Sequence, residues 1–165
     1  MTLIAEDKAN RVLDACRQHN LKLATVESCT GGLIIASLTD IAGSSDVVEC
    51  GFITYSNEAK EALVGVSRQL IDDVGAVSQP VAVAMAEGAL EHSRADIAVS
   101  VTGIAGPGGG TAEKPVGLVH MAVACKGKPT HHHEAHFGTL GREKVRQATV
   151  ERALGLILEI LHKTK

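Results

Sequence analysis

Hydrophobic and polar residues follow two different periods along this chain. Apolar residues recur at every third or fourth position over Ile4–His19, which predicts a first helix. Residues 21–26 alternate instead, which is typical of a strand. A polar and glycine-containing turn over 27–32 then precedes an apolar stretch over 33–38. The N-terminal part of the chain therefore predicts helix, strand, tight turn and helix.

A second strand is predicted over 47–55, where apolar and β-branched residues are frequent. Ser56 or Asn57 would cap the helix that follows, because short polar side chains at that position accept hydrogen bonds from the first free amides. Lys60 would then lie about one turn into this helix.

Two more helices are predicted before the next strand. Ser67 and Ser78 are their expected caps, and the second helix runs from about 80 to 90, with a proline in its first turn. The next strand is predicted over 95–102, since its β-branched residues recur at every second position. A glycine-rich segment over 103–110 follows, so a second strand ends in a glycine-rich turn.

The C-terminal part predicts an antiparallel hairpin and a long helix. Residues 116–125 and 130–137 read as the two strands of the hairpin, and Thr139 or Gly141 would open a helix that extends to about His162. Alternating helices and strands favour parallel crossovers, whereas a hairpin requires an antiparallel pair. We therefore expect an α/β fold, a three-layer α/β/α sandwich around a mixed parallel/antiparallel sheet, in one domain over residues 1–165.

Composition and charge narrow the class of protein. The chain has 165 residues, 45% of them hydrophobic and 21% charged, and its formal net charge is −3, which is typical of a globular domain with a real core. Aromatic residues make up only 2%, so the core must be aliphatic. Without a basic tract the chain lacks the main source of affinity for nucleic acid, so we expect no nucleic-acid partner.

The sequence also predicts a compartment. No apolar run approaches the roughly 18 residues needed to span a bilayer, and residues 1–8 carry acids where a signal peptide would be basic and then apolar. We therefore expect a cytoplasmic protein with no membrane partner. The cysteines form no paired motif, so free thiols are expected; they are Cys16, Cys29, Cys50 and Cys125.

Three segments follow predicted strands and would meet at one edge of the sheet. In α/β sheets the ligand crevice lies at the carboxyl ends of the strands, where loops lead into helices. Segments 27–32, 55–60 and 102–110 are all expected at such ends. The sequence thus predicts a ligand site built from these three segments.

Ser28 is the candidate nucleophile of the first segment. It occupies the turn between a strand and a helix, where backbone amides can point toward a ligand, and Gly31 and Gly32 allow the backbone to approach it closely. The alternative is that Ser28 or Thr30 only caps the following helix. The segment lacks the Gly-x-Ser-x-Gly pattern of the α/β-hydrolases and a recognisable His–Asp pair.

A serine needs a base, and Lys60 is the candidate. A lysine can replace histidine when burial or a nearby positive dipole keeps its amine neutral. The alternative is an ordinary solvated lysine on a helix. Tyr55 could relay a proton or donate its hydroxyl to the substrate, or it could be a buried structural tyrosine.

The third segment and the last helix supply candidate ligand contacts. Amides of the glycine-rich loop from Gly103 to Gly106 could bind an anion, although the loop matches no known phosphate motif and could be only a flexible turn. Thr102 could offer a hydroxyl to the same pocket. Arg142, at the start of the last helix, could hold a phosphate with its planar fork.

Two other chemistries are possible on the residues alone. Cys29 could be the nucleophile, because a thiol near a helix N-terminus has a depressed pKa, or it could be a small buried residue. His131, His132 and His133, with His136, suggest a metal site, but adjacent strand residues face opposite sides and no carboxylate or thiolate cluster completes the set. A polar edge strand is the preferred interpretation, and we expect no metal and no cofactor.

Several motifs in this order resemble those of the CinA C-terminal domain family. The resemblance covers nearly the whole chain, and the chain looks like the stand-alone form of the domain. The segments that carry it are Glu27–Gly32, Thr39–Ser45, Gly51–Lys60, Gly75–Ser78, Thr102–Pro107 and Lys114–Gly117.

The resemblance implies an activity. Members of this family include nicotinamide-nucleotide amidohydrolases, which convert nicotinamide mononucleotide and water into nicotinate mononucleotide and ammonia in pyridine-nucleotide salvage, part of NAD metabolism. It implies Ser28 as nucleophile, Lys60 as base and Tyr55 beside them, forming a Ser-Lys dyad that needs no metal. The expected substrate-binding residues are Cys29, Thr30, Gly31, Gly32, Thr102, Gly103, Gly106 and Arg142.

The expected partners are a small nucleotide substrate and further copies of the chain. A homo-oligomer is expected because the sheet would otherwise leave its edges uncovered. Two other functions are compatible with the residues: a hydrolase of another nucleotide-linked amide, and a non-catalytic module that binds a nucleotide or a protein through its glycine loops.

Overall fold

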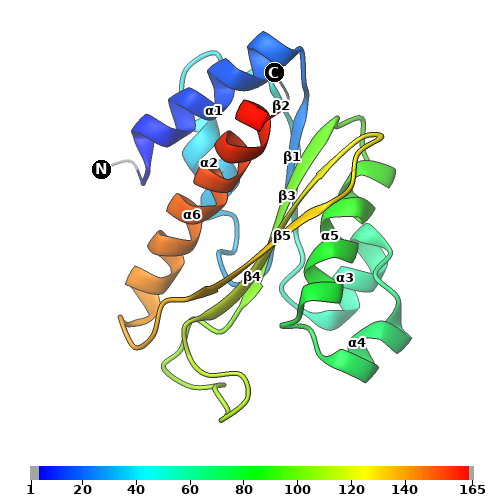
Figure 1. Ribbon diagram of the computed structural model, residues 1–165, viewed down its shortest axis with the longest axis vertical. Helices are drawn as coiled ribbons and strands as arrows, with labels where there is room; N and C mark the ends of the chain where they lie inside the picture. The colour runs from blue at the N-terminus through cyan, green and yellow to red at the C-terminus, as the bar shows by residue number, and fades with distance from the viewer. Residues whose placement is uncertain (1–3, 164–165) are drawn as a thin grey trace.

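The computed structural model describes residues 4–163 and has five strands and six α-helices there (Figure 1). Residues 1–3, part of the segment that argued against a signal peptide, lie outside this range. The strands are β1 (Leu23–Glu27), β2 (Val48–Ile53), β3 (Ile97–Gly103), β4 (Leu118–Cys125) and β5 (His131–His136). The helices are α1 (Glu6–His19), α2 (Leu33–Thr39), α3 (Asn57–Val64), α4 (Arg68–Val74), α5 (Gln79–Glu91) and α6 (Arg142–Lys163).

The strands form one mixed sheet in the order β2-β1-β3-β4-β5. β1 lies between β2 and β3 and is parallel to both, so the carboxyl ends of these three strands meet at one edge of the sheet. β4 is antiparallel to β3, and β5 is antiparallel to β4. The expected mixed sheet is therefore confirmed.

Helices cover both faces of the sheet (Figure 1). Helices α1, α2 and α6 pack on one face and α3, α4 and α5 on the other, which confirms the three-layer α/β/α architecture. The two central parallel strands are buried from both sides, as expected when helices lie on each face. Val99 of β3 belongs to the core under α1 and α6, whereas its neighbour Ala98 belongs to the core under α5.

Three serines were expected to cap helices, and two of them do. The Ser56 hydroxyl accepts a hydrogen bond from the Ala59 amide at the start of α3. The Ser67 hydroxyl accepts one from the Leu70 amide at the start of α4. Ser78 stands at the N-cap of α5, but its hydroxyl donates instead to the carbonyl of Gly75, 2.8 Å away. The prediction that the Ser78 side chain caps α5 was therefore wrong, although the helix does begin directly after Ser78, as predicted.

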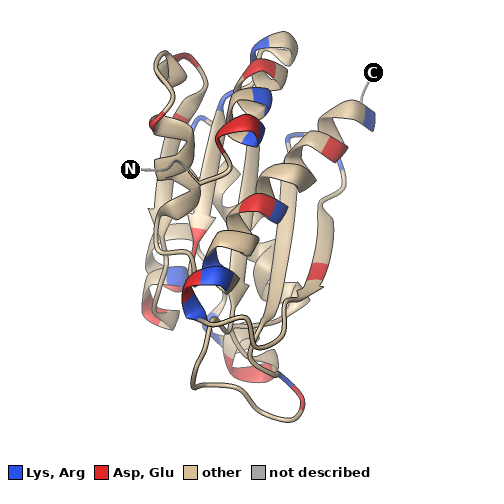
Figure 2. Cartoon of the chain, turned by 90° about the vertical axis from the view of Figure 1, so that its left-hand side faces the viewer, with Lys and Arg blue, Asp and Glu red and all other residues tan. Residues whose placement is uncertain are grey.

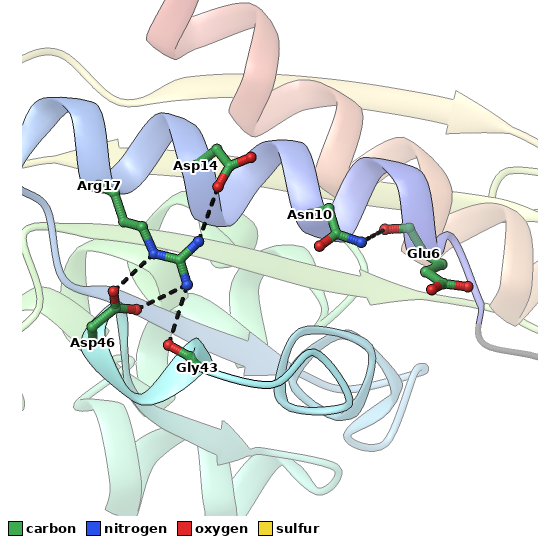
Figure 3. Close-up of polar contacts among 6 residues, drawn as sticks. All are labelled: Glu6, Asn10, Asp14, Arg17, Gly43 and Asp46. Atoms are coloured by element: carbon green, nitrogen blue, oxygen red, sulfur yellow. Dashed lines mark hydrogen bonds and ion pairs between the residues drawn. The ribbon is translucent and has the colours of Figure 1, made fainter.

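A short 3-10 helix, η1 (Ser44–Asp46), precedes β2 and was not predicted. Arg17 of α1 holds it by a bidentate pair with Asp46, at 2.8 and 3.1 Å, and by a hydrogen bond to the Gly43 carbonyl (Figure 3). The guanidinium lowers the pKa of the Asp46 carboxyl, chiefly through the hydrogen bond between the Arg17 and Asp46 side chains. Because these groups are exposed, the contact fixes the position of the turn more than it stabilises the fold.

The histidine-rich strand β5 forms one edge of the sheet. His133 accepts a hydrogen bond from Arg152 of α6, while the His132 ring lies on the other face and stacks on His120 of β4, with 2.8 Å between their nitrogens. This alternation confirms the predicted strand. Within residues 4–163 no three histidine, cysteine or acidic side chains are grouped so as to hold a metal ion. No helix of that range is long and apolar enough to cross a membrane.

Candidate active site

The three segments that follow β1, β2 and β3 meet in one cavity. Its volume is about 220 Å³, and it lies at the carboxyl edge of the parallel strands, with the start of α6 closing one side. Figure 2 shows basic residues gathered at that end of α6. The lining residues are Ser28, Cys29, Tyr55, Asn57, Lys60, Ala76, Val77, Thr102, Gly103, Ala105 and Arg142.

Ser28 is the first residue after β1. Its amide donates to the carbonyl of Val101 in β3, 3.1 Å away, so the residue is anchored to the centre of the sheet. Its side chain lines the cavity, and the residue is only 8% exposed. The hydroxyl thus lies in a sheltered position with a fixed backbone beneath it.

Lys60 lies opposite Ser28, although 32 residues separate them in sequence. It stands one turn into α3 and is 1% exposed, so the alternative of a solvated lysine was wrong. Its Nζ lies 3.2 Å from the Ser28 Oγ. The same nitrogen donates to the carbonyls of Thr54, at 2.8 Å, and Tyr55, at 3.4 Å.

Burial lowers the pKa of the Lys60 ammonium below its ordinary value of 10.5. A neutral amine has two N–H donors and one lone pair. The carbonyls of Thr54 and Tyr55 can take the two donors, which leaves the lone pair for the Ser28 proton. The site can therefore hold a neutral lysine whose amine has a partner for both of its N–H groups and for its lone pair.

Tyr55 and Arg142 meet at the rim of the cavity. The Arg142 guanidinium donates to the Tyr55 hydroxyl at 3.1 Å and to the carbonyl of Gly106 at 2.8 Å. Tyr55 is 61% exposed, so the alternative of a buried structural tyrosine was wrong. Its hydroxyl lies beside a cation, whereas only its backbone carbonyl contacts Lys60.

Thr102 and Gly103 form the floor at the end of β3. The Thr102 hydroxyl donates to the carbonyl of Ala76, at 3.0 Å, and so fixes the loop before α5 that lines the cavity. At Gly103 a Cβ would lie 2.8 Å from the carbonyl oxygen of Leu118, so only glycine allows β4 to approach this closely. Gly106 offers its carbonyl to the rim arginine but does not itself line the cavity.

The turn after Ser28 does not match the alternative interpretation, in which Ser28 or Thr30 only caps the following helix. Thr30 is fully buried, and its hydroxyl donates to the Glu27 carboxylate at 2.7 Å. That carboxylate also accepts the first amides of α2, from Ile34 at 2.9 Å and Ile35 at 3.0 Å. Neither Ser28 nor Thr30 caps α2, because a buried glutamate does so.

Gly31 and Gly32 complete this turn. Both have left-handed backbones, with φ of 57° and 105°, which side chains rarely adopt. The Gly31 amide donates to the Ser28 carbonyl at 3.0 Å and closes the turn, and neither glycine lines the cavity. Gly31 and Gly32 would therefore affect ligand binding only indirectly, through the backbone conformation that they give to the turn.

Cys29 faces the cavity as a thiol. Burial raises its pKa to about 12, and the nearby Glu27 carboxylate acts in the same direction. The depressed thiol pKa predicted from the sequence is therefore wrong, because burial outweighs the influence of the helix N-terminus.

Three residues that shape the site were not predicted to belong to it, although Asn57 was considered as an alternative cap of the helix that is α3. Asn57 lines the cavity from the start of α3, where Ser56 and not Asn57 is the cap, and its side-chain amide has no hydrogen-bond partner among residues 4–163. Glu27 belongs to the Glu27–Gly32 segment of the family resemblance, but no function was predicted for it. Arg146 donates to the carbonyls of Cys29 and Thr30, each at 3.1 Å. Its position four residues after Arg142 was the available signal, since such residues share a helix face.

Comparison with known proteins identifies relatives over almost the whole chain. The model of the CinA C-terminal domain matches residues 5–161. A CinA-like protein of Akkermansia muciniphila is 50% identical over 146 residues, which is 88% of this chain and 35% of that protein. One from Syntrophobacter fumaroxidans is 48% identical over 88% of this chain and 34% of its own length. The chain thus spans about a third of the length of these curated relatives.

Solved structures agree with the sequence comparison. The competence/damage inducible protein CihA from Agrobacterium tumefaciens superimposes with a TM-score of 0.94 at 50% identity, over 98% of this chain and 99% of that one. A CinA superfamily protein from Escherichia coli gives 0.90 at 33% identity, over 94% of this chain and 90% of that one. Together with the match to the domain model, these similarities show that the chain belongs to the CinA C-terminal domain family.

Proposed function

We propose that this protein is a nicotinamide-nucleotide amidohydrolase, or NMN deamidase, that hydrolyses the carboxamide of nicotinamide mononucleotide by a Ser-Lys mechanism. The observation that supports it most is the 3.2 Å contact between Lys60 Nζ and Ser28 Oγ in a sheltered cavity. A nucleophile within hydrogen-bond reach of a base, itself oriented by further groups, is the arrangement of covalent hydrolases.

The first half of the reaction is acyl transfer. Neutral Lys60 takes the Ser28 proton as Oγ attacks the carboxamide carbon, and the carbonyl oxygen becomes an oxyanion held by backbone amides. Lys60 then gives its proton to the nitrogen of the leaving group. The C–N bond breaks, ammonia leaves, and an ester joins Ser28 to the nicotinoyl group.

Water completes the reaction. Lys60 removes a proton from the water as it attacks the ester carbon, and the proton returns to Ser28 Oγ when the C–O bond breaks. Nicotinate mononucleotide is released, so one water is consumed for each ammonia. Each step uses only proton transfer and charge stabilisation by this chain's own groups, so the scheme uses no metal or cofactor.

The cavity would take the ring and not the whole nucleotide. Its volume of about 220 Å³ is below the roughly 300–1,000 Å³ of pockets that enclose drug-sized ligands. The nicotinamide ring would enter toward Ser28, while the ribose phosphate would lie at the rim beside Arg142, whose guanidinium supplies the cation that a phosphate requires. Asn57 offers an unpaired amide to the ring substituent or the ribose.

A pyridine-nucleotide substrate implies action in the cytoplasm as part of NAD salvage. The exposed edges of the sheet at β2 and β5 support the expectation of a homo-oligomer. Light scattering of the purified protein, with a monomer mass as the contrary result, tests the oligomer independently of the activity.

Ammonia release from nicotinamide mononucleotide tests the activity. Wild type, Ser28→Ala, Cys29→Ala and Lys60→Ala would be compared, with product identified by mass. We expect turnover in wild type and Cys29→Ala, and its near-complete loss in the other two variants. Wild-type turnover in Ser28→Ala would refute the serine mechanism, and loss confined to Cys29→Ala would move the nucleophile by one residue.

The same assay separates the alternatives. Tight binding of nicotinamide mononucleotide with no ammonia at high enzyme concentration would indicate a non-catalytic nucleotide-binding module. Ammonia from a different nucleotide-linked amide would indicate another substrate for the same dyad.

A further inference from the structure

Arg146 is the only arginine of α6 that contacts the turn carrying Ser28 within the described residues. Its Nε donates to the Cys29 carbonyl and its Nη2 to the Thr30 carbonyl, both at 3.1 Å. The side chains of Arg146 and Thr30 do not line the cavity, whereas Cys29, whose peptide carries the Thr30 amide, does. Arg146 therefore lies on the side of the turn that faces away from the ligand space.

A carbonyl bound from behind fixes the direction of the amide in the same peptide. In a trans peptide the C=O and N–H groups point in opposite directions. Arg146 holds the carbonyls of the Cys29–Thr30 and Thr30–Gly31 peptides, so the amides of Thr30 and Gly31 point away from the guanidinium. The Gly31 amide is already used, because it donates to the Ser28 carbonyl and closes the turn.

The Thr30 amide is left free. It donates to no acceptor in the part of the chain that the structure describes, although the residue itself is fully buried. A buried amide without a partner costs free energy and therefore calls for an explanation, and a catalytic role is one that such a group can have. From the other side, the Glu27 carboxylate holds the Thr30 hydroxyl at 2.7 Å, so the residue is fixed at both its side chain and its carbonyl.

We propose that Arg146 is a positioning residue that aims the Thr30 amide at the oxyanion formed when Ser28 attacks its substrate. This inference deepens the proposed function and rests on Ser28 as the nucleophile, but not on nicotinamide mononucleotide as the substrate. Arg142 and Arg146 lie one turn apart on α6 and would have different roles. Arg142 would contact the substrate at the rim, and Arg146 would fix the backbone behind the nucleophile.

Labelling by a fluorophosphonate probe tests this without the natural substrate. Ser28 Oγ attacks phosphorus, the P–O bond forms, fluoride leaves, the proton passes to Lys60, and the negative oxygen on phosphorus needs the same amide donor. The rate would be followed by the mass of the peptide containing Ser28. The variants are Arg146→Met, Arg146→Lys and, as the control, Arg152→Met, which removes a partly buried arginine of the same helix that contacts His133 and Glu159.

We expect Arg146→Met to label about 10- to 100-fold more slowly than wild type, because removal of one oxyanion donor costs about 10²–10³ and the misaimed amide still contributes in part. Arg146→Lys should be intermediate, since an ammonium cannot bind both carbonyls with a planar fork, and Arg152→Met should match wild type. With nicotinamide mononucleotide, kcat should fall in parallel while KM stays within about threefold, since the oxyanion exists only in the transition state.

Four outcomes would overturn the inference: wild-type labelling of Arg146→Met, an equal loss in Arg152→Met, a change confined to KM, or no labelling of Ser28 in the wild type. If wild type labels but releases no ammonia, and Arg146→Met still labels more slowly, the proposed substrate fails while the positioning role stands. Thermal unfolding of each variant separates these results from a general loss of folding.

Discussion

The amine of Lys60 and the hydroxyl of Ser28 lie 3.2 Å apart although the residues belong to different strand–helix units. Lys60 reaches the serine from the first turn of α3, and its remaining donors go to the carbonyls of Thr54 and Tyr55. The pair therefore depends on β1 and β2 lying side by side in the sheet, which brings the ends of the two strands together.

Activity should rise with pH because Lys60 must be neutral to accept the Ser28 proton. Burial lowers its pKa from 10.5, so kcat/KM should increase about tenfold per pH unit on the acid side and level off below pH 10.5. A pH–rate profile of ammonia release measures this. A profile that is flat, or that falls as pH rises, would contradict Lys60 as the base.

The same lowered pKa links Lys60 to stability. Between its folded pKa and 10.5 the unfolded chain holds the proton and the folded chain does not, so the free energy of unfolding should increase with pH across that window. Lys60→Met lacks this titration. Its stability relative to wild type, measured by urea unfolding, should therefore grow as the pH falls from 10.5 through that window and then become constant.

Cys29 should be dispensable for catalysis. Burial raises its pKa to about 12, so almost no thiolate exists at neutral pH. We expect Cys29→Ala to keep kcat within about tenfold of wild type, with the remaining loss coming from the small cavity it leaves. Rapid inactivation of wild type by iodoacetamide at pH 7, absent in Cys29→Ala, would show a reactive thiolate and contradict this prediction.

Arg142 should act on substrate affinity through its charge. Arg142→Met removes the cation at the rim, and since a charge-assisted hydrogen bond contributes about 1.5–3 kcal/mol, KM for nicotinamide mononucleotide should rise roughly 10- to 100-fold. Tyr55→Phe keeps the guanidinium and should raise KM less. The control substrate is nicotinamide riboside, which lacks the phosphate: equal loss with both substrates would show that Arg142 does not bind the phosphate.

Glu27 should be needed for stability because its carboxylate is fully buried and accepts four hydrogen bonds. The donors are the hydroxyls of Thr25 and Thr30 and the amides of Ile34 and Ile35. Glu27→Gln replaces one accepting oxygen by an NH₂ group that faces donors, which should cost about 1–3 kcal/mol.

Urea unfolding measures this cost, and Glu91→Gln is the matched control because Glu91 is exposed on α5. An equal effect of the two substitutions would contradict the role of Glu27 in holding the start of α2.

Two helical glycines should respond oppositely to alanine. A Cβ at Gly88 of α5 would collide with the carbonyl oxygen of Val64, where α3 ends, so Gly88→Ala should destabilise the protein by about 1–3 kcal/mol. A Cβ at Gly155 of α6 would make only ordinary contacts with long side chains, so Gly155→Ala should stabilise it by about 0.5–1 kcal/mol. Thermal unfolding compares them, and a stabilised Gly88→Ala would contradict the close packing of α3 on α5.

The order of helices and strands was determined by the sequence itself. Local periodicity decides whether an apolar face is continuous on a helix or on a strand, so each expected element is present to within a few residues at its ends. The mixed sheet followed as well, since alternation and a hairpin allow few topologies. The short turn η1 carried no periodic signal and was missed.

The roles of individual side chains were decided by tertiary structure. Whether Lys60 is solvated or buried, and whether the Cys29 thiol is reactive, depends on which atoms surround them, and burial dominates both pKa values. Glu27 and Arg146 act on the same short turn from β1 and α6, more than one hundred residues apart. The local sequence pattern specifies which face of each helix or strand is apolar. Which polar groups then meet is decided only by the packing of the layers, because a hydrogen bond depends on the distance between two elements, and the periodicity within one element carries no information about that distance.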